Sequence, residues 1–563
     1  MPSLDFTPFD GRIEPAAPDS VQQPPVLNVR VFPETLPDAT YPEQSNPKYS
    51  AASGKWGACF SGGGPRACAA ALGQMRGLYV ADAVQYLGAI SCVSGGSWFG
   101  APFCYSTMFT DAELLGEYLD PNQITLGNIA AVQPYCIGTG LLNLGNINLA
   151  YIGTRALLRG IPADKLWSRM MNAALLAPFT VDGTDRYVAL DQDDVDAIIA
   201  RNTELSKNSF YTLRPSAPYF IAGGTYIGSA PSIAPSGDLH ARPGTAPLAD
   251  IANAATASLP GQVYRTFEYT AAYTGTPQRF SDPGRTFGGG YVENTGFATG
   301  APSAPPRNGI VSAGTKKYPF LLSDMIGSSS SAFASVAVEL GVPAIAPRFD
   351  YWSPATAGTE TAKTETIGDG GILENIGIVP LLRRGYRTIL AFVNSPYPIG
   401  STDDGCVDGV DGQISRLFGL IPANDFGNSQ NTQIFARAKW QAVANGLAAA
   451  KAAGGPTTYA DTYAIEPNNP FGIPPYPGDG EVRIVWLYND LNQRWYNQLP
   501  SDVQAAIQNQ WTIYPLYNLP NFWTVGQNYG MLLYYTPEQI NLLAHMWAYT
   551  VKTLGVGGLA DHA

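Results

Sequence analysis

One short segment holds a serine in a setting suited to covalent chemistry. The sequence AISCVSGGSWFG (89–100) sets Ser94 after an apolar run and before two glycines. A strand, a sharp turn with serine at its apex and a following helix form a nucleophile elbow, which presents one hydroxyl. The turn crowds the backbone, so glycine is favoured two residues to either side of the serine. Gly96 meets this preference and Cys92 does not. Ser94 is therefore either a candidate nucleophile or an ordinary serine in a tight turn.

A glycine-rich loop about thirty residues upstream could stabilise an oxyanion. The segment SGGGPR (61–66) follows a strand-like run and precedes a stretch with helical spacing. Successive glycines can point backbone N–H groups into one concavity, and the helix adds its positive end. The loop lacks the G-K-[ST] ending of a P-loop and does not spell G-x-G-x-x-G.

A proton acceptor for Ser94 is the remaining requirement. The chain has three histidines, of which His240 precedes any candidate acid, His545 lies in a helical pattern and His562 is next to the last residue. Asp369, in DGGILENIGIVPLL, is followed by two glycines and could approach a serine directly. Partial burial raises the pKa of a carboxylate toward that of a useful base. Asp369 is therefore the candidate base; the alternative is a turn aspartate bonded to its own loop amides.

The elements around these residues predict the fold class. From residue 56 onward the pattern predicts a strand, a turn and a helix, and then the same three elements again. This alternation is typical of a parallel sheet. The sequence predicts an α/β fold with a central, mostly parallel sheet flanked by helices and loop-rich insertions. Residues 1–50 are predicted as an extended arm and 51–563 as one catalytic domain. The uncharged stretch 121–154 is interpreted as a buried irregular insert or a lid.

Composition narrows the possible partners. The net charge of −12 argues against nucleic acid, because phosphate binding needs basic stripes. The six cysteines include no C-x-x-C pair, so they are expected to be reduced, and no metal or cofactor is expected. The sequence shows no signal-peptide pattern and no apolar stretch long enough to span a membrane. A soluble protein is expected, with the cytoplasm favoured and unconventional export left open; the oligomeric state is not predicted.

Together, SGGGPRA, SGGSWFG and DGGILENIGIVPLL resemble the catalytic domain shared by group IV cytosolic phospholipase A2 and the fungal phospholipase B/lysophospholipases, distant relatives of patatin. Weaker similarities extend this resemblance over roughly residues 50–550. It implies a Ser94–Asp369 dyad. It also implies an oxyanion hole at Gly63 and Gly64, with Gly62 completing the turn, and an arginine, Arg66, that steadies the substrate phosphate. From the residues alone, Arg66 could instead pair with a carboxylate and hold the loop.

The resemblance implies a serine hydrolase of phospholipid or lysophospholipid acyl esters that contacts a membrane or micelle surface transiently. Calcium independence is predicted, because the residues before the core are too few for a calcium-binding module and STDDGCVDGVDG (401–412) misses the spacing of a calcium loop. Two alternatives are kept: a neutral-lipid esterase or acyltransferase with the same dyad, and an inactive lipid-binding protein.

Overall fold

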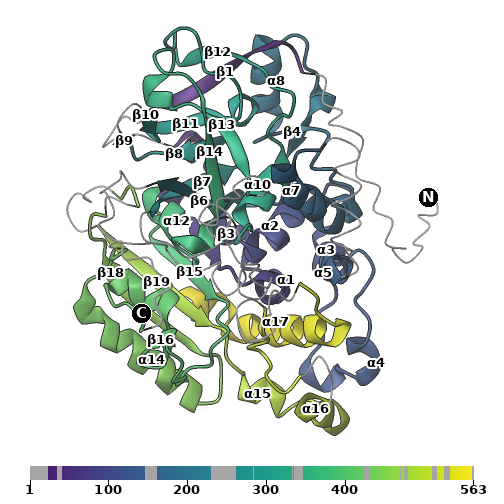
Figure 1. Cartoon of the computed structure of the whole chain (residues 1–563). Helices are drawn as coiled ribbons and strands as arrows, with labels where there is room; N and C mark the ends of the chain where they lie inside the picture. Colours follow the sequence, from purple (N-terminus) through teal and green to yellow (C-terminus); the bar gives the residue numbers. More distant parts are fainter. Residues whose placement is uncertain are drawn as a thin grey trace, which may run out of the picture.

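The computed structural model describes residues 23–33, 41–145, 161–229, 262–282, 285–332, 334, 346–423, 432–468, 471–473, 480–509, 516–524 and 533–560. Within these ranges thirteen strands form one sheet (Figure 1). They are β1 (Val26–Pro33), β2 (Trp56–Phe60), β3 (Leu87–Val93), β6 (Tyr219–Ser229), β7 (Gln262–Thr270), β8 (Tyr273–Thr276), β11 (Gly290–Glu293), β12 (Ile310–Gly314), β13 (Arg348–Tyr351), β14 (Lys363–Asp369), β15 (Thr388–Val393), β18 (Thr458–Ala464) and β19 (Glu481–Tyr488).

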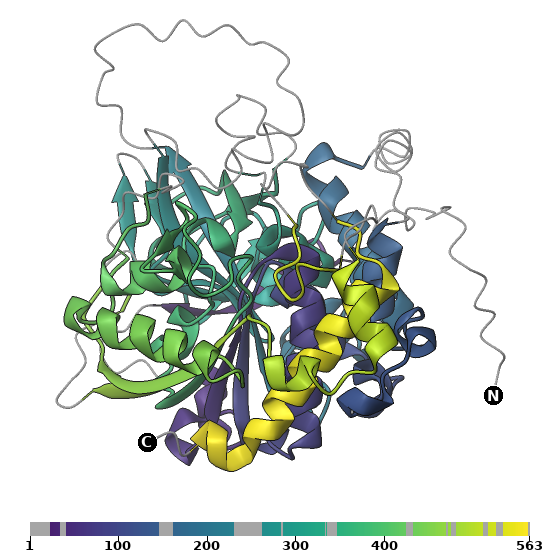
Figure 2. The same cartoon turned by 90° about the horizontal axis from the view of Figure 1, so that it is seen from below.

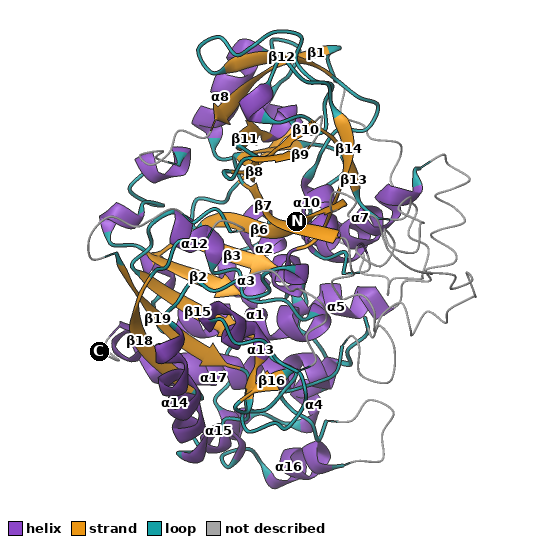
Figure 3. Cartoon of the chain, turned by 60° about the vertical axis from the view of Figure 1, so that its left-hand side comes forward, coloured by secondary structure: helices purple, strands orange, loops and turns teal. Residues whose placement is uncertain are grey.

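Helices pack around this sheet, and short strand pairs lie outside it (Figure 3). The helices are α1 (Gly64–Val80), α2 (Gly95–Tyr105), α3 (Asp111–Leu115), α4 (Leu126–Ile129), α5 (Gly138–Gly145), α7 (Leu166–Met171), α8 (Gln192–Arg201), α10 (Leu322–Ser329), α12 (Val379–Arg383), α13 (Gly412–Ser415), α14 (Trp440–Ala452), α15 (Gln493–Tyr496), α16 (Ser501–Gln508) and α17 (Pro537–Ala560). The strand pairs are β4 (Tyr187–Ala189) with β5 (Phe210–Thr212), β9 (Phe280–Asp282) with β10 (Arg285–Phe287), and β16 (Cys406–Val407) with β17 (Val410–Asp411).

The centre of the sheet is parallel. Its order is β12-β1-β11-β8-β7-β6-β3-β2-β15-β19-β18, and the neighbouring pairs from β6 to β19 all run parallel. The pairs toward β12 and the β19–β18 pair are antiparallel. β3 is buried along its whole length, as expected for a parallel strand with both faces covered. The predicted α/β class is confirmed.

Small residues let the first and last helices pack closely on this core. An ideal Cβ on Gly73 of α1 would stand 2.2 Å from the carbonyl oxygen of Ala544 in α17. One on Gly77 would stand 2.6 Å from Cβ of Val551. Figure 2 shows the C-terminal helix α17, in yellow, running alongside α1. The α1 helix that follows the glycine-rich loop is thus fixed along its length by tertiary packing.

One edge of β6 brings two distant strands together. β3 runs parallel to β6 and ends where Val93 faces Gly223. β14 runs antiparallel to β6 and ends where Asp369 faces Gly224. The other edge of β6 is taken by β7, so β3 and β14 share one edge and approach each other end to end. The carboxyl ends of both strands therefore meet at the same point.

The first fifty residues include a strand of the sheet. β1 pairs with both β11 and β12, and the turn at Pro42–Ser45 contributes the buried Glu43. Glu43 Oε1 lies 2.6 Å from Arg384 Nε. The part of the predicted arm that is described is thus tied into the fold, and residues 1–22 and 34–40 lie outside the described residues.

Part of the uncharged stretch 121–154 packs against the main core. It contains α4 and α5, and the side chains of Ile124, Ile129, Leu141 and Leu144 are buried. Residues 146–154 lie outside the described residues, so a lid function for this stretch stays a prediction.

Candidate active site

Ser94 occupies a strained turn between β3 and α2. Its backbone has φ 51° and ψ −120°, in the region of positive φ that L-residues rarely adopt. The Ser94 N–H donates to the carbonyl oxygen of Ser329 at 3.1 Å, which holds the turn from the side of α10. The side chain is only partly buried. The local structure is the strand–turn–helix geometry predicted for a nucleophile elbow.

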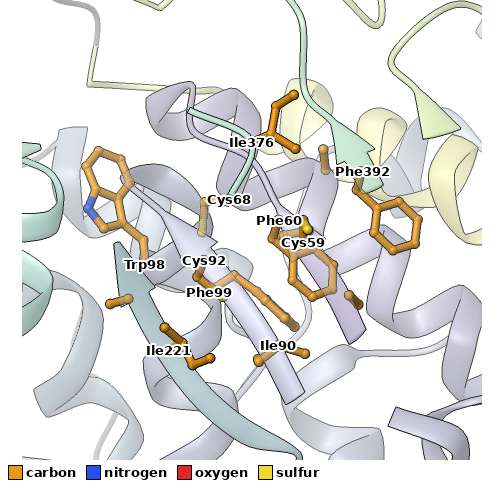
Figure 4. Close-up of a cluster of buried hydrophobic side chains, with 14 of the residues drawn as sticks. Cys59, Phe60, Cys68, Ile90, Cys92, Trp98, Phe99, Ile221, Ile376 and Phe392 are labelled. Carbon is orange, nitrogen blue, oxygen red and sulfur yellow. The ribbon is translucent and has the colours of Figure 1, made fainter. Parts of the chain in front are cut away.

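Cys92 stands where an elbow usually has glycine, and the room for its side chain comes from Gly100 in α2. An ideal Cβ on Gly100 would stand 2.7 Å from Cys92 Sγ and 2.9 Å from the ring of Phe220. Glycine at 100 therefore supplies the room that glycine at 92 would have left. Figure 4 shows Cys92 among buried apolar side chains, next to Phe99. Burial raises the pKa of the Cys92 thiol well above its ordinary value, so this group is an inert packing residue.

The carboxylate of Asp369 meets the Ser94 hydroxyl. Ser94 Oγ donates to Asp369 Oδ2 at 2.8 Å, and the Gly371 N–H donates to Asp369 Oδ1 at 2.7 Å. The side chain of Asp369 is buried, and burial raises its pKa to about 7, against the two hydrogen bonds, which lower it. A carboxylate with a pKa near 7 can accept a proton from a hydroxyl during attack and return it later. The structure thus brings the two predicted dyad residues together without an imidazole.

The glycine-rich loop lies beside this pair. An ideal Cβ on Gly62 would stand 3.1 Å from Ser94 Cβ, and one on Gly95 would stand 2.0 Å from the Gly64 carbonyl oxygen. The Gly62 N–H donates to the Asn375 carbonyl oxygen at 2.9 Å, so this amide is not available to an oxyanion. The described residues offer no acceptor to the N–H groups of Gly63 and Gly64. Of the three predicted glycines, Gly62 shapes the turn and the other two can donate.

Arg66 is buried beneath the loop. Its Nε donates to the Asn394 carbonyl oxygen at 3.0 Å, and its Nη1 donates to the Phe522 carbonyl oxygen at 2.7 Å and to Thr524 Oγ1 at 3.3 Å. The other nitrogen, Nη2, would lie 2.8 Å from an ideal Cβ on Gly63. Burial lowers the pKa of the guanidinium. Arg66 therefore joins the glycine loop to two other segments through carbonyl oxygens, where a carboxylate was the expected alternative.

Two asparagines that the sequence did not single out complete the site. Asn394 directly follows β15. Its Oδ1 accepts a hydrogen bond from Gln74 Nε2 at 2.7 Å, and its Nδ2 donates to the Ser61 carbonyl oxygen at 3.2 Å. The backbone carbonyl oxygen of Asn375 accepts the Gly62 N–H, and the side-chain Nδ2 of Asn375 donates to Gln413 Oε1 at 2.9 Å. Asn375 sits inside DGGILENIGIVPLL, but its role depends on contacts with distant residues that no local pattern predicts.

The histidines make no contribution to the dyad in the described part of the chain. His545 lies in α17, with Nδ1 3.4 Å from Arg76 Nη1, and burial lowers its pKa well below the ordinary value. His240 and His562 lie outside the described residues. Within those residues no three His, Cys, Asp or Glu side chains gather as metal ligands, and no helix is both long and apolar enough to cross a bilayer.

Comparisons with known proteins give no family assignment. No protein-family model matches this sequence, and no curated protein does. The similar solved structures include human GIVD cytosolic phospholipase A2, at 12% identity and a TM-score of 0.45, covering 94% of this chain and 65% of that one. The same human protein with methyl gamma-linolenyl fluorophosphonate, with and without terbium chloride, gives TM-scores of 0.39 and 0.40 at 12% identity, covering 92% of this chain and 62% of the other. The chain thus spans under two thirds of that protein's length.

Proposed function

We propose that this chain is a serine acyl-ester hydrolase that acts on phospholipids or lysophospholipids through a Ser94–Asp369 dyad. The observation that carries the proposal is the 2.8 Å hydrogen bond from the Ser94 hydroxyl to a buried carboxylate, made at the apex of a strained strand–helix turn. Strain of this kind costs on the order of 1–3 kcal/mol and is typically kept where a side chain must be held out for chemistry.

In the proposed reaction Asp369 accepts the Ser94 proton while Ser94 Oγ attacks the ester carbonyl. The developing oxyanion accepts hydrogen bonds from the Gly63 and Gly64 N–H groups, whose loop is held by Arg66 and Asn394. Asp369 then returns the proton to the leaving alcohol. Water, or another alcohol, releases the acyl group from Ser94.

A fluorophosphonate probe tests the nucleophile directly. The wild-type protein should be labelled on Ser94, and Ser94→Ala should abolish both labelling and ester hydrolysis. Ser53→Ala, which alters an exposed serine, is the matched control and should behave as wild type. Absence of labelling in the folded wild-type protein would favour an inactive lipid-binding protein.

One observation favours the alternative of a neutral-lipid esterase or acyltransferase. Three of the Arg66 hydrogen bonds go to the protein itself, which suits a loop brace better than a phosphate ligand. Hydrolysis of phosphatidylcholine and of triacylglycerol by wild type and Arg66→Ala separates the two. A selective loss on phosphatidylcholine supports the phosphate role, and equal losses support the brace.

Calcium independence belongs to the same proposal. Hydrolysis by the purified protein should be unchanged by a calcium chelator. A strict calcium requirement would contradict it.

A further inference from the structure

The side-chain oxygen of Asn375 faces the candidate active site. An ideal Cβ on Gly62 would stand 2.1 Å from Asn375 Oδ1 and 3.1 Å from Ser94 Cβ. An ideal Cβ on Gly371 would stand 2.5 Å from Asn375 Oδ1 and 3.1 Å from Asp369 Oδ1. The described residues donate no hydrogen bond to this oxygen. Asn375 Oδ1 is thus an available acceptor beside both members of the dyad.

A chain of hydrogen bonds fixes which end of the Asn375 amide points there. Asn375 Nδ2 donates to Gln413 Oε1 at 2.9 Å, and Gln413 Nε2 donates to Asp411 Oδ2 at 2.8 Å. Burial raises the pKa of Asp411, while its hydrogen bonds from Gln413 and Ser395 and the charge of Arg66 lower it. In its ionised form the carboxylate only accepts hydrogen bonds, so Gln413 turns its NH₂ toward Asp411 and its oxygen toward Asn375. Asn375 must then turn its NH₂ toward Gln413 and its oxygen toward the dyad.

Asp411 is built as an acceptor. Besides Gln413 Nε2, it receives the Gln413 N–H on Oδ1 at 2.9 Å and the Ser395 hydroxyl on Oδ2 at 2.7 Å. The Ser395 hydroxyl oxygen accepts the Tyr397 N–H at 2.9 Å and lies 3.0 Å from the Tyr488 hydroxyl oxygen. Of the two acceptors within reach of the Ser395 proton, Asp411 Oδ2 at 2.7 Å is nearer than the Tyr397 carbonyl oxygen at 3.1 Å. Asp411 is 4% exposed, so water does not compete for these bonds. With Asp411 ionised, the direction of the hydrogen bonds from Asn375 through Gln413 to Asp411 is therefore set by buried groups of the protein.

We propose that Asn375 orients the water that releases the acyl group from Ser94, and that Gln413 and Asp411 are positioning residues that keep Asn375 Oδ1 turned toward that water. The inference rests on the proposed function and deepens it. One proton of the water donates to Asp369 and the other to Asn375 Oδ1, so that a lone pair of the water oxygen is directed at the acyl carbon.

The water oxygen forms a bond to the acyl carbon, and its proton passes to Asp369. The tetrahedral intermediate then breaks its bond to Ser94 Oγ, which takes the proton back from Asp369. The carboxylic acid leaves, and the dyad returns to its starting state. Asn375 accepts a hydrogen bond throughout and exchanges no proton.

Asp411→Asn is the sharpest test, because it keeps the shape and lies two side chains away from the dyad. An amide at 411 can turn its NH₂ toward Gln413, which reverses the chain and presents the NH₂ of Asn375 to the water. With a 4-nitrophenyl ester, deacylation should slow by about 10- to 100-fold. Ser94 phosphonylation by the fluorophosphonate probe should change by less than about threefold. The variant should show a burst of one nitrophenol per Ser94 followed by slow turnover.

Asp404→Asn is the matched control, since it makes the same change at an exposed position of the same loop, and it should turn over as wild type does. Asn375→Ala is the second variant and should give the same split between fast acylation and slow deacylation if Asp411→Asn does not fold. Wild-type deacylation in folded Asp411→Asn, or in Asn375→Ala, would overturn the inference. Equal slowing of phosphonylation and deacylation would also overturn it, because that is the result of a merely structural role. A wild-type protein that is neither labelled nor acylated on Ser94 would overturn the proposed function itself.

Discussion

Asp369 and Glu268 are two buried carboxylates that flank neighbouring residues of β6, one on each edge of that strand. Their surroundings shift the two pKa values in opposite directions. Asp369 faces Gly224 and Glu268 faces Gly223 in the sheet register. Asp369 receives one hydroxyl and one backbone N–H, and burial raises its pKa to about 7. Burial alone would also raise the pKa of Glu268, but Arg384 and Arg383 outweigh burial and leave that pKa lowered.

The cations account for the difference. Glu268 Oε1 lies 2.7 Å from Arg383 Nη1 and Glu268 Oε2 lies 2.8 Å from Arg384 Nη2, and Arg384 also binds Glu43. We call these four residues the buried ion cluster; their side chains are at most 1% exposed. A carboxylate paired in this way stays ionised and holds segments together, whereas one without a cation can exchange a proton near neutral pH.

The largest expected effect is the loss of the base. Asp369→Asn keeps the shape but cannot accept the Ser94 proton, so ester hydrolysis should fall by about 10²- to 10⁴-fold. Steady-state rates on a soluble ester, with circular dichroism to show an unchanged fold, measure this. Glu268→Gln is the comparison variant, and its activity per folded molecule should stay within a few-fold of wild type. Retained activity in Asp369→Asn would end the dyad account.

Breaking the buried ion cluster should instead cost stability. Glu268→Gln leaves Arg383 and Arg384 without a full counter-charge, which in a buried pair costs about 3–5 kcal/mol of the free energy of unfolding. Denaturant titration of wild type, Glu268→Gln and the exposed control Asp404→Asn measures it. A loss below about 1 kcal/mol would show that water reaches the cluster.

The raised pKa of Asp369 should make the stability of the protein depend on pH. In the unfolded chain Asp369 has its ordinary pKa of 3.8, whereas burial raises that pKa to about 7 in the folded protein. Between pH 4 and pH 7 the folded protein therefore holds a proton that the unfolded chain has lost, so the free energy of unfolding falls as pH rises through this window. The full effect is on the order of 4 kcal/mol. Asn at 369 cannot ionise, so Asp369→Asn should gain stability relative to wild type from pH 4 to pH 8. A stability difference that is flat across this range would contradict a raised pKa.

Activity should follow the same ionisation. Below a pH of about 7 the dyad base is protonated, so kcat/KM on an uncharged ester should rise about tenfold per pH unit and level off above pH 7. Rates between pH 5 and pH 9 provide the measurement. A plateau that extends down to pH 5 would show that Asp369 ionises as an ordinary carboxylate.

The smallest effect is expected at Cys92. Cys92→Ala removes one buried sulfur from the cluster in Figure 4, so stability should fall by about 1 kcal/mol while kcat/KM stays within about threefold of wild type. Cys104→Ala, a buried cysteine on the same helix as Gly100, is the matched control. A large loss of activity in Cys92→Ala alone would show that the elbow depends on this side chain.

Local sequence was enough to place three of the site's parts. The apolar run before Ser94 and the two glycines after it predict a strand, a turn and a helix, because these backbone preferences act over a few residues. The same holds for the glycine-rich loop before α1 and for the turn after Asp369. The central parallel sheet followed from the alternation of these elements.

Other features depended on residues far apart in the chain. Three of these features are consequences of packing between distant segments. Gly100 leaves the room that Cys92 needs, the Asn375 backbone oxygen accepts the Gly62 N–H, and carbonyl oxygens hold Arg66. The strand β1 in the predicted arm belongs with them, since its partners β11 and β12 follow it by more than two hundred residues.

The sequence by itself determined which groups could react and the turns that hold them, because those turns are set by neighbouring residues. Only the tertiary structure decided that the ends of β3 and β14 meet on one edge of β6. It also decided that no cation from the described part of the chain pairs with Asp369 there, while Glu268 has two. The proton affinity of a buried carboxylate depends on the water it has lost and on the charges around it, and neither is a property of its neighbours in the chain.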